Sequence, residues 1–487
     1  MSEEFIHAAQ WVFLGYFVFL NLGYMALNVI AMSSLRRYMQ ARGVDSLPSV
    51  YANFELPTSI LVPAYNEEAT ITSSIRAMLQ LKYPEFEVIV INDGSSDGTL
   101  ARLIEEFELI PFPEAYRIRL QTQPVRTVYR SRVYPNLRII DKANGGKADA
   151  LNAGINAARF PLYCGVDADS VLQPDSLQRI VQPFLDDPNT VACGGTVRIA
   201  NGCRVSGGFM EKIALPRNPL ALLQVVEYLR AFLFGRLGWS PINALLIISG
   251  AFGLFKKETV IAAGGYRTDT VGEDMELVVR IHKMLRKEKR PYRITFVPDP
   301  ICWTEVPEDL KTLKNQRQRW QHGLAESLTM NFRMMCNLRG GWVSWFAFPF
   351  MFLFEFLGPL LEVGGYLFFA LAYLQGWISM EAYLAFMLVA IGLGILLSTS
   401  ALLLEELSFH IYPRARHMAA LFAVAILENF GYRQLNAFFR LLGLLRWMLG
   451  RKGSWGEMTR TARWSTPEPE KPPRSDEPQG IVTRVTE

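Results

Sequence analysis

Cysteine is scarce in this sequence, and the few cysteines are not spaced like those of a metal ribbon. The 487 residues include five cysteines, and no two of them form a Cys-x-x-Cys pair. A zinc ribbon needs such pairs, and a disulfide framework needs a dense set of cysteines. The pattern argues against both and is typical of a protein in a reducing compartment.

A strong net charge is also missing. Lysine and arginine number 50 and aspartate and glutamate 46, which gives a net charge of +4 at pH 7. This charge is too small to indicate nucleic acid, which attracts proteins mainly through a large positive excess. Half of the residues are hydrophobic and the mean hydropathy is positive, which is high for a soluble enzyme. The apolar residues collect at the two ends, around a middle with the composition of a water-soluble α/β domain.

The first apolar segment, Trp11–Met32, contains no charged residue. It is long enough to cross the hydrocarbon core of a bilayer, which takes about 20 residues. A cleaved signal peptide is the alternative, but that would need a basic start and a shorter apolar run. The positive-inside rule predicts that the middle domain lies in the cytoplasm, because three arginines follow the segment (Arg36, Arg37 and Arg42).

Two more spans are expected toward the C-terminus, at Phe346–Tyr373 and Ala382–Leu404. The former contains Glu355 and Glu362, which share one face of a helix. Because a charged side chain is costly against lipid, we expect both glutamates to contact protein or a polar pathway. The candidate partners lie on the later basic stretch and are also seven residues apart (Arg433 and Arg440).

The segment Met418–Leu449 mixes arginines with Leu, Phe and Trp. It favours a basic amphipathic helix in the membrane interface, with a short membrane hairpin as the alternative. Ser465–Glu487 is rich in Pro, Glu and Ser and is predicted to be disordered. The predicted units are a transmembrane helix (1–34), a cytoplasmic domain (50–335), a membrane region with at least two spans (342–450) and the tail (465–487).

Strand and helix patterns alternate through the middle of the chain. Such alternation predicts right-handed βαβ units and a mostly parallel, Rossmann-like sheet. Ligands bind such sheets at the carboxyl ends of the strands. The predicted strands are Thr58–Pro63, Phe86–Ile91, Leu137–Ile140 and Leu162–Val166, and the predicted helices begin near Ile71, Thr99 and Ala148.

Acidic residues follow two of these strands. Asp93 comes after the second, and Asp167 and Asp169 come after the fourth. Two carboxylates at one strand end can share a hard cation such as Mg²⁺, whose other ligands are water and substrate phosphates. The alternative is a loop whose acids cap the helix that begins near Pro174.

The run Asn144–Asp149 opens a helix with a glycine turn and Lys147. Its backbone N–H groups and its charge are suited to a phosphate. The spacing is not that of a P-loop, and no Ser or Thr follows the lysine. The alternative is an ordinary turn.

Two later motifs lie on predicted helices. Glu273 and Asp274 start an apolar helical run, where they are either partners of the helix dipole or a general base. The basic stretch from Gln316 to Trp320 contains Arg319, which can grip a diphosphate, and a tryptophan that can stack on a sugar ring. The alternative for this stretch is a solvated or membrane-facing helix surface.

The order of these motifs is more specific than any one of them. Val62–Glu67, then Asn92-Asp93-Gly94, Asp-Ala-Asp, Glu-Asp and finally Gln-x-x-Arg-Trp resembles the family 2 glycosyltransferases. The chain is most similar to the membrane branch with cellulose, hyaluronan, chitin and poly-N-acetylglucosamine synthases. The resemblance covers roughly residues 56–326 and implies a GT-A-type domain flanked by transmembrane helices.

The resemblance also implies roles for individual residues. Asp274, with Glu273 beside it, corresponds to the general base, and Asp169, with Asp167, to the ligands of Mg²⁺ or Mn²⁺. The residues that would bind the nucleotide donor are Ala64, Tyr65, Glu67, Asp93, Lys147, Asp149 and Asp167. Those on the acceptor and diphosphate side are Gly250, Gln316, Arg319 and Trp320.

From the resemblance we expect an inverting, multi-pass enzyme of the cell (inner) membrane that transfers sugar from a UDP-sugar to a growing glycan. One alternative adds one or a few sugars to a lipid-linked acceptor, and another is an inactive membrane scaffold. Expected partners are the donor, a glycan or lipid-linked acceptor, membrane lipid and envelope export proteins. The chain departs from the family pattern where Gly272 replaces a threonine before Glu-Asp, and its C-terminal region lacks the Arg-x-x-x-Arg pattern of a cyclic-di-GMP-binding domain.

Overall fold

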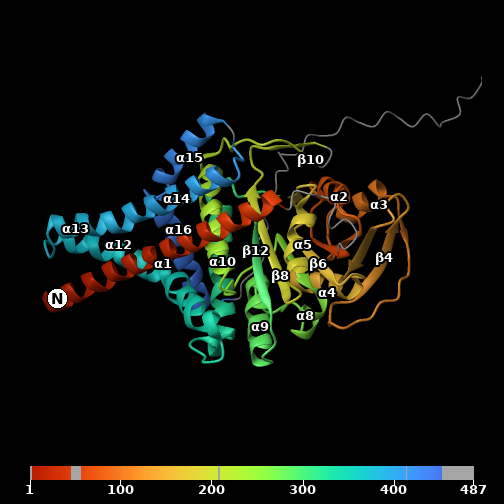
Figure 1. Cartoon of the computed structure of the whole chain (residues 1–487), viewed down its shortest axis with the longest axis horizontal. Helices are drawn as coiled ribbons and strands as arrows, with labels where there is room; N and C mark the ends of the chain where they lie inside the picture. The colour runs from red at the N-terminus through yellow and green to blue at the C-terminus, as the bar shows by residue number, and fades with distance from the viewer. Residues whose placement is uncertain (1–2, 45–55, 207–208, 413, 452–487) are drawn as a thin grey trace, which may run out of the picture.

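The computed structural model describes residues 3–44, 56–206, 209–412 and 414–451. The tail predicted at 465–487 lies outside this part of the chain. A domain built on a sheet occupies one side of the molecule, and long helices extend from the other side (Figure 1). The helices α9 (Glu273–Lys287) and α10 (Leu310–Met330) lie between these two parts.

The centre of the sheet matches the sequence prediction. Strand β1 (Thr58–Ala64) pairs in parallel with β2 (Phe86–Asn92) on one side and with β6 (Leu162–Val166) on the other, and β5 (Leu137–Lys142) pairs in parallel with β2. Parallel strands are covered on both faces, and β1 contributes alternate residues to two apolar clusters, one per face. The connecting helices are α2 (Ile71–Leu79), α3 (Thr99–Glu106) and α4 (Lys147–Ala157).

Further strands make the sheet mixed rather than mostly parallel. Strand β11 (Phe252–Lys256) lies antiparallel between β6 and β8 (Thr190–Ile199), and β12 (Arg293–Thr304) is parallel to β8. At the opposite edge, β3 (Leu109–Pro111) and β4 (Val125–Ser131) are antiparallel. The order is β3-β4-β5-β2-β1-β6-β11-β8-β12-β7. The expected α/β class is confirmed.

The remaining elements of this domain are short. They are the strands β7 (Val171–Leu172), β9 (Arg204–Ser206) and β10 (Phe209–Lys212), the helices α5 (Ser176–Asp186), α6 (Pro219–Tyr228), α7 (Arg236–Trp239) and α8 (Lys257–Ala262), the π-helix η1 (Leu229–Gly235) and the 3₁₀ turn η2 (Phe332–Met334).

Two helices in the described part of the chain are long and apolar enough to cross a membrane. One is Glu3–Gln40 within α1 (Glu3–Val44), and the other is Met380–Ser408. A third span results if the pair Val343–Phe356 and Gly358–Leu374, bent by 46°, is one span. The three segments expected from the sequence fall within these helices. Their elements are η3 (Val343–Ala347), α11 (Phe348–Phe350), η4 (Met351–Phe356), α12 (Gly358–Leu374), α13 (Met380–Met387), η5 (Leu388–Gly392) and α14 (Leu393–Ser408).

The segment with mixed arginines and apolar residues forms two helices, α15 (Ala415–Leu427) and α16 (Tyr432–Met448). Gly431 separates them with a φ of 107°, a backbone conformation that favours glycine. Helix α16 packs along α10 and α12. Its arginines contact protein: Arg440 pairs with Glu355 at 2.7 Å, and Arg446 donates to Gln318. The expected partnership of Glu355 with Arg440 is confirmed.

Candidate active site

Two predicted donor-binding carboxylates are joined by a buried lysine. Lys142, at the end of β5, contacts Asp93 at 2.5 Å and Asp149 at 2.6 Å. All three side chains are buried. Removing one partner of such a pair leaves an uncompensated charge in the interior. The trio therefore fixes the end of β2 against the start of α4.

The glycine turn before α4 is organised by Asp93. The N–H groups of Gly145 and Gly146 donate to its carboxylate, at 3.1 Å and 2.7 Å for the shorter contacts, and Asn144 donates to its carbonyl oxygen at 2.8 Å. Gly146 has a φ of 86°, which a residue with a side chain rarely adopts. In the structure these two N–H groups therefore bond to Asp93, and the expected role of the turn in binding a phosphate remains a prediction.

Lys147 lies among carboxylates from two other elements. Its ammonium group donates to Asp167 and lies 3.9 Å from Glu273. It also donates to the carbonyl oxygen of Gly250 at 3.4 Å. Burial alone would lower the pKa of Lys147, but Asp167 and Glu273 raise it above its ordinary value. The lysine is therefore a fixed positive charge where predicted donor, metal and catalytic residues meet.

The two acids at the start of α9 differ in their surroundings. Glu273 is buried, and this burial raises its pKa to about 7. Asp274 is partly exposed, and its carboxylate accepts from the backbone N–H of Gly250 at 3.2 Å and of Met275 at 2.8 Å. Of the two carboxylates, Asp274 is the accessible one, and its orientation is fixed from the loop before β11.

The donor set at the end of β6 suits a hard cation. Asp167 and Asp169 supply carboxylate oxygens two residues apart, directly after the strand. In the described part of the chain, no group of three or more His, Cys, Asp or Glu side chains could hold a metal. Mg²⁺ in phosphoryl sites commonly takes one or two carboxylates and completes its shell with phosphate and water. The pair fits that arrangement.

The predicted acceptor helix α10 exposes one face and buries another. Trp320 is 43% exposed, and its ring lies 4.3 Å from the guanidinium of Arg317. Arg317 is buried and pairs with Glu227 at 2.8 Å. Gln316 is buried as well, and Arg319 is partly exposed. The guanidinium of Arg317 therefore packs against the inner face of the Trp320 indole.

Three further residues predicted to bind the donor lie at the end of β1 and in the loop that follows it. Tyr65 is 52% exposed and Ala64 is buried. Asn66 has a φ of 56°. Glu67 accepts from Thr70 at 3.0 Å. The carbonyl oxygen of Ala64 accepts from the backbone N–H of Asp93 at 2.9 Å. The role of these residues in donor binding remains a prediction.

Packing against α10 explains why Gly272 replaces a larger residue. A Cβ at Gly272 would lie 2.7 Å from the carbonyl oxygen of Gly323 on α10, which is too close for real atoms. Ser327 donates to the carbonyl oxygen of Gly272 at 3.3 Å, and Thr270 donates to Glu326 at 2.7 Å. The start of α9 is therefore held directly against α10.

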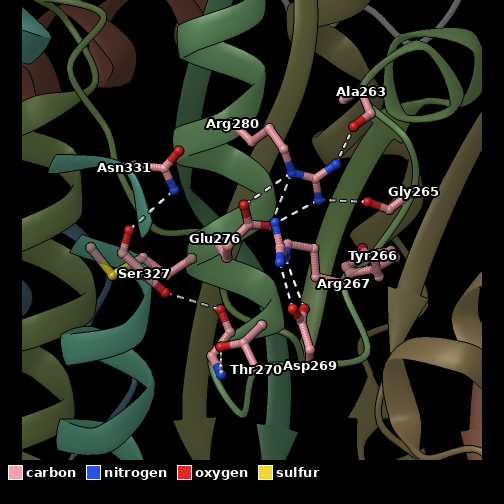
Figure 2. Close-up of polar contacts among 12 residues, drawn as sticks. Ala263, Gly265, Tyr266, Arg267, Asp269, Thr270, Glu276, Arg280, Ser327 and Asn331 are labelled. Atoms are coloured by element: carbon pink, nitrogen blue, oxygen red, sulfur yellow. Dashed lines mark hydrogen bonds and ion pairs between the residues drawn. The ribbon is translucent and has the colours of Figure 1, made fainter. Parts of the chain in front are cut away.

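A second contact holds the loop before α9. Figure 2 shows Arg280 reaching from α9 to the carbonyl oxygens of Ala263 and Gly265 while its guanidinium pairs with Glu276. Glu276 is buried, and the pair distance is 2.8 Å. These bonds hold the segment that precedes α9 against that helix.

Sequence reasoning missed three residues of this site. Lys142 has the sequence context of an ordinary strand end, although its position just before the glycine turn could have indicated a role in the site. Arg317 occupies a variable position of Gln-x-x-Arg-Trp. Arg236 lies 3.7 Å from the Phe232 ring, and burial lowers its pKa to about 10. Their roles depend on contacts between distant segments.

Two family models match the chain. The model described as Glycosyl transferase family 2 matches residues 59–208, and the one described as Glycosyl transferase family group 2 matches residues 165–398. The matched ranges include the lysine cluster, both acidic motifs and Gln-x-x-Arg-Trp.

Curated relatives and a solved structure are also similar. The poly-beta-1,6-N-acetyl-D-glucosamine synthase of Staphylococcus epidermidis is 31% identical over 275 residues, and that of Staphylococcus aureus strain COL is 32% identical over 277 residues. Each alignment covers 56% of this chain and 56% of the relative, so the chain spans about half the length of the curated relatives it matches.

The solved structure is the mannosyltransferase PcManGT from Pyrobaculum calidifontis in complex with GDP-Man and Mn²⁺. It is 19% identical, with a TM-score of 0.48, and the alignment covers 85% of this chain and 99% of that chain. From the two family-model matches, which together run from residue 59 to residue 398, the chain belongs to the family 2 glycosyltransferases.

Proposed function

We propose that this chain is an inverting glycosyltransferase that moves a sugar from a UDP-sugar onto a growing polysaccharide at the cytoplasmic face of a membrane. The observation that carries the proposal is the meeting of Asp167, Glu273 and Gly250 at Lys147, with Asp274 bonded to Gly250. This cluster joins a donor-side lysine to an accessible base. The similarity to poly-N-acetylglucosamine synthases favours UDP-N-acetylglucosamine as the donor.

Donor binding would use the positive charge of Lys147. A diphosphate that enters the cluster can take over part of the contact now made by Asp167. Asp167 and Asp169 would hold Mg²⁺ or Mn²⁺ on the diphosphate. When bound, such an ion neutralises charge on the leaving group. Arg319, from α10, would act later, by neutralising the charge that grows on the diphosphate as it leaves.

The transfer step follows from the position of Asp274. Its carboxylate takes the proton of an acceptor hydroxyl as the hydroxyl oxygen forms a bond to the anomeric carbon of the donor sugar. The bond between that carbon and the diphosphate oxygen breaks, and UDP leaves with the electron pair. Attack from the opposite face inverts the anomeric centre. General base catalysis of this kind contributes about 10²–10⁴ in rate.

Trp320 is suited to hold the acceptor. One face of its exposed indole can stack on a sugar ring, while the guanidinium of Arg317 lies against the other face of the indole. Ring stacking tolerates successive sugars, which favours a growing polymer over a single addition. The apolar helices, two or three by length and composition, support the placement in a membrane, with the sheet domain in the cytoplasm by the positive-inside rule.

A panel of radiolabelled nucleotide sugars, incubated with membranes that contain the full chain and Mg²⁺ or Mn²⁺, tests the proposal. We expect label from one UDP-sugar in a product long enough to stay near the top of a gel. Products one or two sugars longer than a lipid acceptor would support the single-addition alternative. No UDP release with any donor would support an inactive scaffold.

A further inference from the structure

The membrane helix pair is bent where its backbone loses hydrogen bonds. Pro359 has no N–H group, so the carbonyl oxygen of Glu355, four residues earlier, lacks its helical donor. The N–H of Leu360 donates to Leu357 at 3.0 Å and so leaves the carbonyl oxygen of Phe356 without that donor. Buried carbonyl groups without partners are costly. The bend of 46° therefore creates two acceptors that other parts of the protein must satisfy.

Helix α10 supplies the missing donor. The side-chain amide of Gln321 donates to the carbonyl oxygens of Glu355 at 3.1 Å and Phe356 at 3.2 Å. Arg440 of α16 donates to the Glu355 carbonyl at 2.7 Å. Gln321 is buried, and it directly follows Trp320 in the sequence. The residue that satisfies the bend is thus the neighbour of the exposed indole.

The same side chains are bonded to one another. Arg440 donates to the side-chain oxygen of Gln321 at 2.9 Å and pairs with the Glu355 carboxylate at 2.7 Å. Tyr24 of α1 donates to that carboxylate. The elements α1, α10 and α16 therefore all contact Glu355 of the bent pair, and Gln321 is the contact from α10.

A second row of contacts runs parallel to this one. Arg446 donates to Gln318 at 2.5 Å, and a Cβ at Gly443 would lie 2.7 Å from the carbonyl oxygen of Gln318. The two variable positions of the motif, Arg317 and Gln318, thus face protein together with Gln321. One face of α10 is fixed, and the opposite face carries Arg319 and Trp320.

We propose that Gln321 and Arg440 are positioning residues that tie the bend of the membrane helix pair to α10 and so set where Arg319 and Trp320 stand in the active site. The tie runs through the main-chain carbonyls of the bend, and the Glu355 carboxylate plays a lesser part. The inference rests on the proposed function for the roles of Arg319 and Trp320. It adds that a change at the bend alters transfer without altering donor binding.

The test compares Gln321→Leu with Glu355→Gln in the full chain, reconstituted in lipid nanodiscs. Leucine keeps the approximate size of glutamine and removes both donor bonds, whereas Glu355→Gln keeps the main-chain carbonyls. We expect Gln321→Leu to lower kcat about tenfold or more, because small misplacements of reacting groups cost up to about 10²-fold. The affinity for UDP should stay parental within about twofold, and the kcat of Glu355→Gln within about threefold, because the amide oxygen of glutamine can still accept from Arg440 and Tyr24.

Hydrogen exchange provides a readout that does not depend on activity. Gln321→Leu should speed amide exchange in residues 316–324 of α10, and Gln182→Leu, at a partly exposed position of α5, should leave both exchange and kcat at the parental values. Parental kcat in Gln321→Leu, a parallel loss of UDP affinity, or an equal loss in Glu355→Gln would overturn the inference. If the parent transfers no sugar from any donor, the proposed function fails, and the exchange of α10 still decides whether the tie exists.

Discussion

At the scale of single residues, charge around Lys147 decides how the site behaves. One lysine faces Asp167 and Glu273, and Asp274 lies next to them on α9. Because three carboxyl groups surround a single ammonium group, the site favours an added positive charge. A divalent cation brought by the diphosphate would meet that demand.

The metal prediction concerns Asp169. Asp169→Ala should weaken UDP binding in Mg²⁺ or Mn²⁺ about tenfold and leave the weak binding in EDTA unchanged, since one hard ligand of the cation is lost. Isothermal titration of UDP with and without metal measures both values. Asp175→Ala, on the following helix, is the control. An unchanged metal dependence in Asp169→Ala would show that this carboxylate is not a ligand.

A second prediction concerns pH and Glu273. Burial raises the pKa of this acid from 4.5 to about 7, so the folded chain binds more protons than the unfolded chain. The stability that this group contributes is full below pH 4.5 and is lost as the pH rises through about 7. Glu273→Gln should therefore flatten the fall of the thermal midpoint over that window. Glu105→Gln, on the exposed face of α3, should follow the parent, and an unchanged slope in Glu273→Gln would contradict the assignment.

Sequence patterns predicted which acids matter but not how they are paired. Asp93 and Asp149 stand at strand and helix ends, where ligands bind, and the prediction rested on that position. Lys142 lies between them in space because β5 sits beside β2, which no local pattern states. The pairing makes both carboxylates organisers of the loop, and direct contact with the nucleotide remains a prediction for them.

At the scale of elements, the contact between α9 and α10 connects Asp274, the proposed base, to α10, the proposed acceptor helix. The closest approach joins Gly272 and Gly323, each of which would clash with a Cβ on the other. Threonine, common in the family at the first of these positions, does not fit this spacing. At this position the chain therefore lacks the threonine hydroxyl beside Asp274 and has instead a close contact between Gly272 and Gly323.

Gly272→Thr tests that contact. The added side chain should push the helices apart and destabilise the fold by about 1–3 kcal/mol, as overpacking usually does, with a loss of turnover. Thermal unfolding in detergent and the rate of UDP release measure the two effects. Gly15→Ala is the control, because a Cβ there meets nothing within 4 Å. A parental midpoint and rate for Gly272→Thr would show that the contact is not needed.

The elements that sequence reasoning found are those with regular local patterns. The strands β1, β2, β5 and β6 each contain a run of apolar or β-branched residues, and each predicted strand begins at the residue found. Strand β4, next to the edge strand β3, contains two arginines, so it lacks the apolar run that marks the predicted strands. Strands β8, β11 and β12 are defined by pairing between distant segments, which a linear pattern does not reveal.

At the scale of the whole molecule, buried ion pairs join the sheet domain to the membrane helices. Arg198 of β8 pairs with Glu405 of α14 at 2.7 Å, and Arg230 of η1 pairs with Glu428 after α15 at 2.6 Å. Breaking such a pair by removing one partner costs about 3–5 kcal/mol. The pairs and the Gln321 contacts join the domain that carries the proposed active site to the long helices.

Cysteine labelling can test on which side of the membrane the sheet domain lies. In a chain with Cys336→Ser, which removes the exposed native thiol, we expect Glu3→Cys to react with a membrane-impermeant maleimide added outside intact cells. Asn189→Cys, in the loop before β8, should react only after permeabilisation. Labelling of Asn189→Cys in intact cells would place the sheet domain outside and contradict the proposed cytoplasmic site.

The most direct test of the central claim is the rate at which the purified full chain, in nanodiscs with Mg²⁺ or Mn²⁺, converts UDP-N-acetylglucosamine into UDP and glycan. Asp274→Asn removes the base and nearly preserves its shape, so UDP binding should be parental while transfer falls by about 10²–10⁴. Glycan formation by the parent at a rate equal to UDP release, and its loss in Asp274→Asn, is the predicted result. Near-parental transfer by Asp274→Asn, or UDP release by the parent without glycan, would contradict the account.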